Sequence, residues 1–371
     1  MPLNSVKLFR KSLSYLLILI IVLLSDSCVC LKNAGQSSES EGNFPSLNDE
    51  PFLNGFSVYF TQPDNSSSGT FRGGPDLDLV KCIDGAKVSV DVALLKLNLW
   101  SVRDALIDAN RRGISVRVVI DSDHMDEKEI QELTETGIPV LGDQRERLMH
   151  HKFVVVDRND VWTGSMNLTL SDVYRNNNNL IHITSPDLAK NFTTEFEEMF
   201  IANRFGDESL ANTPYPIVYV NGVRIENCFS PDDDCGSWIV SLIDNAQKSI
   251  YFLTFSFTSD EIANAMIRGA KRGVLISGVF DKSQYHQNQG TEFDKLDAAG
   301  LDVRLSENEH SMHHKVIIID SRIVITGSYN FTYSAENWND ENLLIIYSPE
   351  IAGLYQEEYQ KIYRLTNKKK P

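Results

Sequence analysis

The sequence predicts a duplicated α/β fold with two pseudo-twofold halves, each a mixed β-sheet flanked by helices. Residues 82–121 and 242–281 show the same order of helix, strand, helix and strand, 160 positions apart. Apolar strands alternate with glycine-terminated helices at the spacing of βα units. The motifs "HHKFVVVD" and "HHKVIIID" follow these blocks at an offset of 163 positions, so the length difference falls in the intervening loops.

The N-terminal residues 1–30 are typical of a secretory signal. Basic residues precede the apolar run 16–24, and small residues follow it. Because this run is shorter than the roughly 20 apolar residues of a membrane-spanning helix, it favours export over an anchor. We expect a secreted, periplasmic or cell-envelope protein, with Cys28 a candidate for lipidation despite the weak "SDS" before it.

Residues 31–55 predict a flexible linker, because they are polar and rich in Ser, Asn and Gly, with no apolar periodicity. The first half should then extend over residues 56–205 and the second over residues 217–368. The boundary lies near "RFGDESLANTPYP", where the pattern of alternating strands and helices is interrupted.

Each half should contain two strands separated by an amphipathic helix. A helix leads through a short polar turn into the first apolar strand, and an amphipathic helix then ends at Gly113 or Gly273. The second strand ends in Asp121 or Asp281.

The histidine motif opens the next strand, where successive side chains alternate between the two faces. His150 and Lys152 should therefore point the same way, and His151 should point into the half behind them. The second copy repeats the arrangement with His313, Lys315 and His314.

A second element, Gly-Ser-x-Asn-x-Thr, begins seven residues after the aspartate that closes each of these strands. The first copy comprises Asp157, Gly164, Ser165, Asn167 and Thr169, and the second Asp320, Gly327, Ser328, Asn330 and Thr332.

One His, one Lys, one Ser and one Asn, present twice, suit chemistry at a phosphodiester. Lysine and amide donors can hold the charge of a phosphoryl group, one neutral imidazole can attack phosphorus, and a second can protonate the leaving oxygen. Such a site needs no metal and no cofactor. A single His-x-Lys motif would indicate little, and clustered histidines can bind zinc, but each pair here is split between strand faces, without suitably spaced Cys or carboxylate ligands.

The segments "HHKFVVVDRNDVWTGSMN" and "HHKVIIIDSRIVITGSYN" resemble the paired HKD motifs of the phospholipase D superfamily, over roughly residues 56–365. The resemblance implies a phospholipase D-like α/β sandwich and a monomer with its active site at the seam between the halves. It also implies two catalytic histidines, His150 and His313, and two phosphate-binding lysines, Lys152 and Lys315. Asn167 and Asn330 would complete the oxyanion contacts, with Ser165 and Ser328 nearby and Asp157 and Asp320 as supports.

The first half departs from the family pattern. The family often places an acidic residue after the G-S-x-N turn to hold the catalytic imidazole. The second half has Glu341, whereas Asn178 stands in the equivalent place of the first half. We expect Glu341 to pair with His313 and keep it protonated as the general acid, which leaves His150 neutral as the nucleophile of a covalent phosphohistidine intermediate.

The cysteines and the charge set further bounds. Cys228 and Cys235 are candidates for a loop disulfide in an oxidising compartment, and Cys82 is expected in the core. The net charge of −16 argues against a protein whose whole surface grips a polyanion.

Three functions remain open. The favoured one is a phospholipase D-type enzyme that hydrolyses or transfers a phospholipid head group, with peripheral membrane association. The alternative is an exported nuclease acting on DNA or RNA, and a non-catalytic binding protein is the third. A nuclease would need a locally basic groove, for which the candidates are Arg72, Lys96, Arg145 and Arg147. The aromatic run Tyr251, Phe252, Phe255 and Phe257 is expected in the core rather than in a pocket wall.

Overall fold

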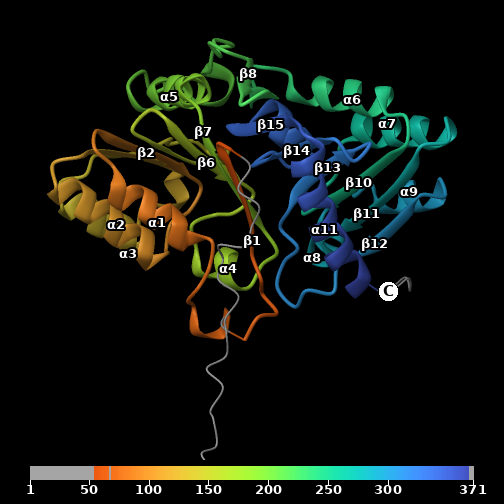
Figure 1. The fold of residues 1–371 in the computed structure, drawn as a ribbon, viewed down its shortest axis with the longest axis horizontal. Helices are drawn as coiled ribbons and strands as arrows, with labels where there is room; N and C mark the ends of the chain where they lie inside the picture. Colours follow the sequence, from red (N-terminus) through yellow and green to blue (C-terminus); the bar gives the residue numbers. More distant parts are fainter. Residues whose placement is uncertain (1–53, 67, 367–371) are drawn as a thin grey trace, which may run out of the picture. The chain divides into compact units, whose positions relative to one another are not determined.

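The computed structural model describes residues 54–66 and 68–366, so the predicted signal and nearly all of the predicted linker lie outside the described residues. The described chain forms two mixed sheets flanked by helices (Figure 1), which confirms the predicted fold class. The first described strand, β1, begins at Phe56, and β8 begins at Ile217.

The first sheet has the order β1-β7-β6-β5-β2-β3-β4. Its strands in this order are Phe56–Phe60, Asn179–Thr184, Asp160–Gly164, Lys152–Val156, Ser89–Leu94, Ser115–Ile120 and Val140–Gly142. The strands β2, β3 and β4 run parallel, as the βα repeat predicts, whereas β5 joins β2 antiparallel and starts an antiparallel run through β6 and β7.

The second sheet has the order β12-β11-β10-β13-β14-β15-β9-β8, which repeats the first with an added strand at one edge. Its strands in this order are Asp302–Leu305, Leu275–Phe280, Ser249–Thr254, Lys315–Ile319, Ile323–Gly327, Glu341–Tyr347, Val223–Ser230 and Ile217–Val220. The motif strands β5 and β13 therefore occupy equivalent central positions.

The helices of the first half are α1 (Asp76–Gly85), α2 (Trp100–Arg111), α3 (Lys128–Glu135), α4 (Leu170–Tyr174) and α5 (Pro186–Phe200). Those of the second half are α6 (Cys235–Asn245), α7 (Asp260–Lys271), α8 (Lys282–Gln287), α9 (Phe293–Ala298), α10 (Tyr333–Asn337) and α11 (Pro349–Leu365). Short 3₁₀ turns cover Ser68–Thr70, Ser122–His124 and Gly206–Glu208. Side-chain caps explain several starts: Ser185 and Ser348 each accept a hydrogen bond from a first-turn amide of α5 or α11.

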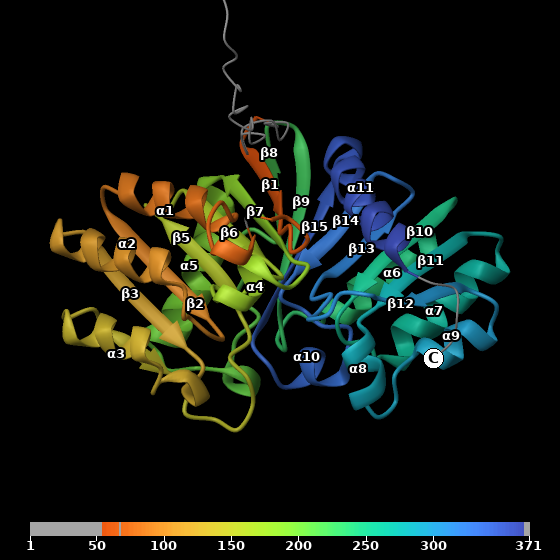
Figure 2. The same cartoon turned by 90° about the horizontal axis from the view of Figure 1, so that it is seen from below.

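The helices divide into outer and inner groups. One apolar cluster joins α1, α2 and α3 to the outer face of the first sheet, and a second joins α6, α7 and α9 to the outer face of the second sheet. A third cluster joins α5, α11 and the inner faces of both sheets, so both halves share one central core (Figure 2). This shared core fixes the two motif strands relative to each other.

No helix within residues 54–66 and 68–366 combines the length and the apolar character needed to span a membrane.

Candidate active site

The two histidine motifs meet because each pairs with the other half. The amide of His150 donates to the carbonyl oxygen of Asp340 at 3.0 Å, and the amide of His313 donates to that of Asn177 at 2.8 Å. The accepting residues follow α10 and α4 respectively, so each short helix delivers its chain to the opposite motif. The seam is therefore reciprocal.

The adjacent histidines face opposite sides as predicted, although they lie just before the motif strands, which begin at Lys152 and Lys315. His150 lies on the side of Lys152, whose ammonium donates to the His150 carbonyl oxygen at 2.8 Å. His151 lies on the opposite face, fully buried, with Nε2 3.0 Å from a Glu195 oxygen and its ring against Phe153. Lys315 likewise donates to the His313 carbonyl oxygen, at 2.9 Å, while His314 is fully buried on the other face.

Two aspartates hold the residue before each site histidine. Asp121 accepts a hydrogen bond from the Met149 amide at 3.0 Å, and Asp281 accepts one from the Met312 amide at 2.8 Å. Both were predicted only as strand ends. Their equivalent placement in the repeat was the available signal that they serve the motif.

The glycine of each G-S-x-N turn is required by the close approach of a neighbouring strand. Gly164 and Gly327 have φ angles of +145° and +150°. A Cβ atom at these positions would lie 2.4 Å from the carbonyl oxygen of Asn179 and 2.2 Å from that of Asn342. This approach brings the following serines and asparagines to the seam.

Glu341 contacts His150 rather than His313, so the predicted pairing is wrong. Its Oε2 lies 2.7 Å from His150 Nδ1 and also accepts a hydrogen bond from the Ser328 hydroxyl at 2.6 Å. The prediction assumed that each acidic residue serves its own half. Because the His150 amide pairs with Asp340, the next residue, Glu341, lies beside the histidine of the first half. This contact between the halves is visible only in the three-dimensional structure.

Asn178 takes the same place beside His313. Its Oδ1 lies 3.0 Å from His313 Nδ1 and accepts a hydrogen bond from the Ser165 hydroxyl at 2.9 Å. Asp172 of α4, which sequence reasoning missed, lies behind it: its Oδ1 is 3.3 Å from His313 Nδ1. The two serines therefore fix the partners of the histidines in the structure.

Burial sets the electrostatics of the site. It lowers the pKa of His150 and of His313 well below the usual value, with the two lysines adding to the effect. Burial also lowers the pKa of Lys152 to about 8 and raises the pKa of Glu341 to about 7. Lys315 is shifted downward as well, because it is buried and faces Lys152.

The hydrogen-bond network assigns the tautomers of the two imidazoles. Since Glu341 and Asn178 present acceptor oxygens, His150 and His313 carry their proton on Nδ1. Each Nε2 then has a free lone pair, and that of His313 lies 3.3 Å from the Lys315 ammonium. The arrangement can supply one nucleophilic nitrogen and one proton-transfer nitrogen.

The two motif asparagines differ. Asn167 Nδ2 donates to Asp172 at 3.0 Å. The Oδ1 atoms of Asn167 and Asn330 are buried and have no hydrogen-bond partner among the described residues. Ala335 occupies the position in α10 that corresponds to Asp172, so the second asparagine lacks that carboxylate.

Asp157 and Asp320 lie at the far ends of the motif strands. Asp157 accepts hydrogen bonds from the amides of residues 87–89 at 2.7–3.0 Å. Asp320 does the same for residues 247–249 at 2.6–3.2 Å. Each carboxylate thereby fixes the start of β2 or β10 against its motif strand.

The aromatic run divides between core and site. Phe252 and Phe257 are buried in the outer core of the second half, and Tyr251 packs against Tyr359. Phe255 is the exception to the expected core placement: its ring centroid lies 4.4 Å from that of His313.

Two of the four candidate groove cations are paired with carboxylates. Lys96 Nζ lies 2.9 Å from a Glu127 oxygen. Arg145 pairs with Asp340, which is fully buried. Neither side chain is then a free cation for a nucleic-acid backbone.

The other two candidate groove cations are Arg147 and Arg72. The Arg147 guanidinium lies 3.9 Å from the ring centroid of Trp338, whose ring is 37% exposed. Arg72 is exposed at the surface. The charge of Arg147 is therefore combined with an exposed aromatic residue.

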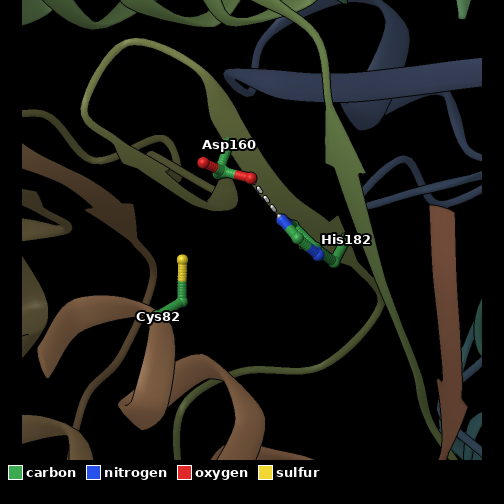
Figure 3. A group of neighbouring side chains, drawn as sticks. All are labelled: Cys82, Asp160 and His182. Carbon is green, nitrogen blue, oxygen red and sulfur yellow. Dashed lines mark hydrogen bonds and ion pairs between the residues drawn. The ribbon is translucent and has the colours of Figure 1, made fainter. Parts of the chain in front are cut away.

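The sulfur atoms of Cys228 and Cys235 form a disulfide that joins β9 to the start of α6. Cys82 is half-buried rather than fully in the core. Its thiol lies near Asp160 and His182, with ligand atoms within 4.8 Å of one another (Figure 3). Burial raises the pKa of this thiol to about 11, which opposes the thiolate that a zinc site needs, and Asp160 already accepts from His182 at 2.8 Å.

Comparison with known proteins finds a family match in each half of the chain. A family model described as "Cardiolipin synthase, PLD-like domain" matches residues 79–200 and 239–363, once in each half. Phospholipase D of Rickettsia felis is 33% identical over 165 residues, which cover 43% of this chain and 82% of that protein. Mitochondrial cardiolipin hydrolase of Xenopus tropicalis is 30% identical over 156 residues, or 41% of this chain and 74% of that protein.

A solved structure has a similar fold. Phosphatidylserine synthase from Haemophilus influenzae Rd KW20 superimposes with a TM-score of 0.63 at 16% identity, covering 84% of this chain and 87% of that chain.

Proposed function

Because the chain belongs to the phospholipase D superfamily and is a phosphodiesterase of that type, we propose that it cleaves or transfers the head group of a phospholipid. One observation carries the proposal: His150 and His313, from separate halves, share one buried centre with two lysines. Each imidazole is held through Nδ1 by a residue of the opposite half, so both Nε2 atoms are available for chemistry.

In the first step, His150 Nε2 attacks phosphorus and forms an N–P bond. The bond from phosphorus to the leaving oxygen breaks, and His313 gives that oxygen its proton. Burial and the two lysines lower the pKa of His313, and the negative charge of a bound phosphate favours its protonated form.

In the second step, His313 takes a proton from water or an alcohol, whose oxygen attacks the phosphohistidine. The N–P bond breaks and His150 is restored. Water gives hydrolysis, and an alcohol gives head-group transfer. Lys152, Lys315 and the motif asparagines hold the non-bridging oxygens, so the positive charge comes from the protein.

Several features support a phospholipid over a nucleic acid. The relatives are named phospholipase D and cardiolipin hydrolase. Lys96 and Arg145 are already paired with carboxylates, and the net charge is −16. Phe255 gives the site an apolar wall beside His313.

We further propose that the protein is exported and acts as a monomer with peripheral membrane association. The Cys228–Cys235 disulfide suits an oxidising compartment. Both half-sites belong to one chain, so a single copy contains every residue the mechanism uses. The exposed ring of Trp338 suits contact with a membrane surface.

The test gives the purified protein phosphatidylcholine vesicles with a primary alcohol and, separately, plasmid DNA, both in excess chelator. Formation of phosphatidyl-alcohol is expected. Nicking of the plasmid without lipid turnover would replace the lipid proposal with the nuclease, and loss of activity in chelator would contradict the reliance on lysines alone. If the protein turned over neither these two substrates nor any other phosphodiester, the proposed chemistry would be contradicted.

A further inference from the structure

The two halves place a carboxylate near the opposite histidine from different positions in the chain. Glu341 begins β15 and contacts His150, whereas the equivalent residue of the first half, Asn178, carries no charge. We infer that Asp172 of α4 is the positioning residue that supplies His313 with this missing carboxylate. The inference rests on the proposed function, in which His313 carries the proton.

The contacts form a closed triangle. Asp172 Oδ1 lies 3.3 Å from His313 Nδ1 and accepts a hydrogen bond from Asn178 Nδ2 at 2.9 Å. Asn178 Oδ1 lies 3.0 Å from the same His313 nitrogen. The Asn178 amide is thus oriented with its oxygen toward the imidazole and its nitrogen toward the carboxylate, and Asp172 acts on His313 both directly and through Asn178.

The carboxylate of Asp172 is held in place from the other side. Its Oδ2 accepts hydrogen bonds from the Thr169 hydroxyl at 2.9 Å and from Asn167 Nδ2 at 3.0 Å. Its own amide donates to the Thr169 hydroxyl, which caps α4. The side chain is buried, so these bonds compete little with water.

The charge of Asp172 acts on the whole centre. Its negative charge raises the pKa of Lys152 and of Lys315, as does that of Glu341, and so opposes part of the effect of burial. Asp121 adds to this effect at Lys152 and Asp281 at Lys315, and both carboxyl groups are buried as well. Removing Asp172 takes one negative charge from this centre, which disfavours a protonated imidazole.

The repeat explains why Asp172 and Asn178 occur together. A carboxylate at position 178 would place two like charges against each other in a buried site, which costs free energy. The second half shows the other arrangement, because Ala335 stands opposite Asp172 in the alignment of the halves and Glu341 stands opposite Asn178. Each histidine therefore has one carboxylate, supplied by either of two positions.

The first test compares wild type with Asp172→Asn on two substrates. The leaving group of phosphatidylcholine is an alcohol, whose alkoxide is strongly basic, so its oxygen must be protonated as the bond breaks. The leaving group of bis(4-nitrophenyl) phosphate is a weakly basic nitrophenolate, which leaves without a proton. We expect kcat on phosphatidylcholine to fall about tenfold to a hundredfold, whereas the rate of release of the first equivalent of nitrophenolate, which needs no proton from His313, should change by less than about threefold. Asp76→Asn, at another buried aspartate of the first half, is the matched control and should lower neither.

The second test moves the carboxylate. Asp172→Ala combined with Asn178→Glu copies the arrangement of the second half, and we expect it to recover most of the activity on phosphatidylcholine lost in Asp172→Ala. Asn178→Glu alone should be worse than this double variant, because it crowds two carboxylates. A double variant no better than Asp172→Ala, with circular dichroism showing all variants folded, would overturn the inference.

A third measurement does not depend on turnover. An NMR titration of isotope-labelled histidine should show a lower pKa for His313 in Asp172→Asn than in wild type, whereas Asp76→Asn should leave the pKa of His313 as in wild type. If the pKa of His313 were the same in Asp172→Asn as in wild type, the inference would be overturned. If wild type turns over neither substrate, the proposed function fails, whereas equal loss on both substrates by Asp172→Asn in an active enzyme contradicts only the role of Asp172.

Discussion

The two halves of the site are equivalent in backbone and different in charge. In both, a serine hydroxyl and the imidazole of the opposite half meet at one oxygen atom, but this oxygen belongs to a carboxylate in Glu341 and to an amide in Asn178. The first half then adds Asp172 one layer further out, where the second half has Ala335. Duplication has preserved the positions, and the distribution of charge between them has changed.

This difference bears on the roles of the histidines. A carboxylate in short contact with Nδ1 makes Nε2 more nucleophilic and stabilises the positive charge of an imidazole bonded to phosphorus. Glu341 at 2.7 Å gives His150 this direct support, while His313 receives a weaker contact relayed through an amide. The assignment of His150 as the nucleophile therefore stands as a proposal, with a reason opposite to the one drawn from the sequence.

The largest expected effect comes from removing either histidine. His150→Ala and His313→Ala should each lower kcat on phosphatidylcholine by at least about a thousandfold. The first variant lacks the group that accepts the phosphoryl group, and the second lacks the group that protonates the leaving oxygen. They should differ on bis(4-nitrophenyl) phosphate, where His313→Ala can still form the phosphohistidine and release one equivalent of nitrophenolate. Rapid-quench kinetics and mapping of the phosphorylated residue measure this, and label on His313 in the wild type would contradict the assignment.

A smaller effect is expected when the second half is given the chemistry of the first. Glu341→Gln keeps the side-chain shape but leaves His150 with an amide, and Ala335 offers no carboxylate behind it. We expect kcat to fall about a hundredfold with the fold retained. The measurements are steady-state turnover of phosphatidylcholine and the rate of release of the first equivalent of nitrophenolate from the nitrophenyl ester. Since Glu341 supports the nucleophile, the loss of activity should appear on the nitrophenyl ester too, unlike the loss caused by Asp172→Asn. A loss confined to phosphatidylcholine would mean that His313 is the nucleophile and His150 the acid.

The sequence sufficed for the features that the repeat expresses in each half alone. The α/β class, the two parallel strand pairs and the opposite directions of His150 and His151 all follow from local periodicity and strand alternation. Contacts across the seam were beyond its reach, because no local pattern states which half a side chain faces. This is why Glu341 was assigned to His313, and why Asp172, an ordinary capping residue in a short helix, carried no visible signal.

The pH dependence of kcat/KM should reflect one titrating group from each half, Glu341 and Lys152. Burial raises the pKa of Glu341 to about 7, so this carboxyl becomes protonated below that pH and stops supporting His150. Burial lowers the pKa of Lys152 to about 8, so this ammonium loses its charge above that pH and binds phosphate less well. We expect kcat/KM to peak between about pH 7 and 8 and to fall by up to tenfold per unit on each side. Glu341→Gln should flatten the acid side alone, and an unchanged acid side would exclude Glu341 as its source.

The smallest effect on turnover is expected behind the site, at His151. This imidazole is fully buried, contacts Glu195 at 3.0 Å and packs on Phe153 and Phe229. Burial lowers its pKa to about 4 and raises the pKa of Glu195 to about 8, so the neutral ring accepts a hydrogen bond from the neutral carboxyl. His151→Ala leaves a cavity and an unpaired carboxyl. It should reduce the free energy of unfolding by about 2–4 kcal/mol, measured by urea denaturation, while kcat changes less than about fivefold. His314→Ala is the matched variant in the second half, where His314 Nε2 lies 3.6 Å from the equivalent Glu358 and Nδ1 lies 3.1 Å from Asn179 Nδ2 across the seam. A folded but inactive His151→Ala would mean that this histidine, rather than His150, faces the phosphate.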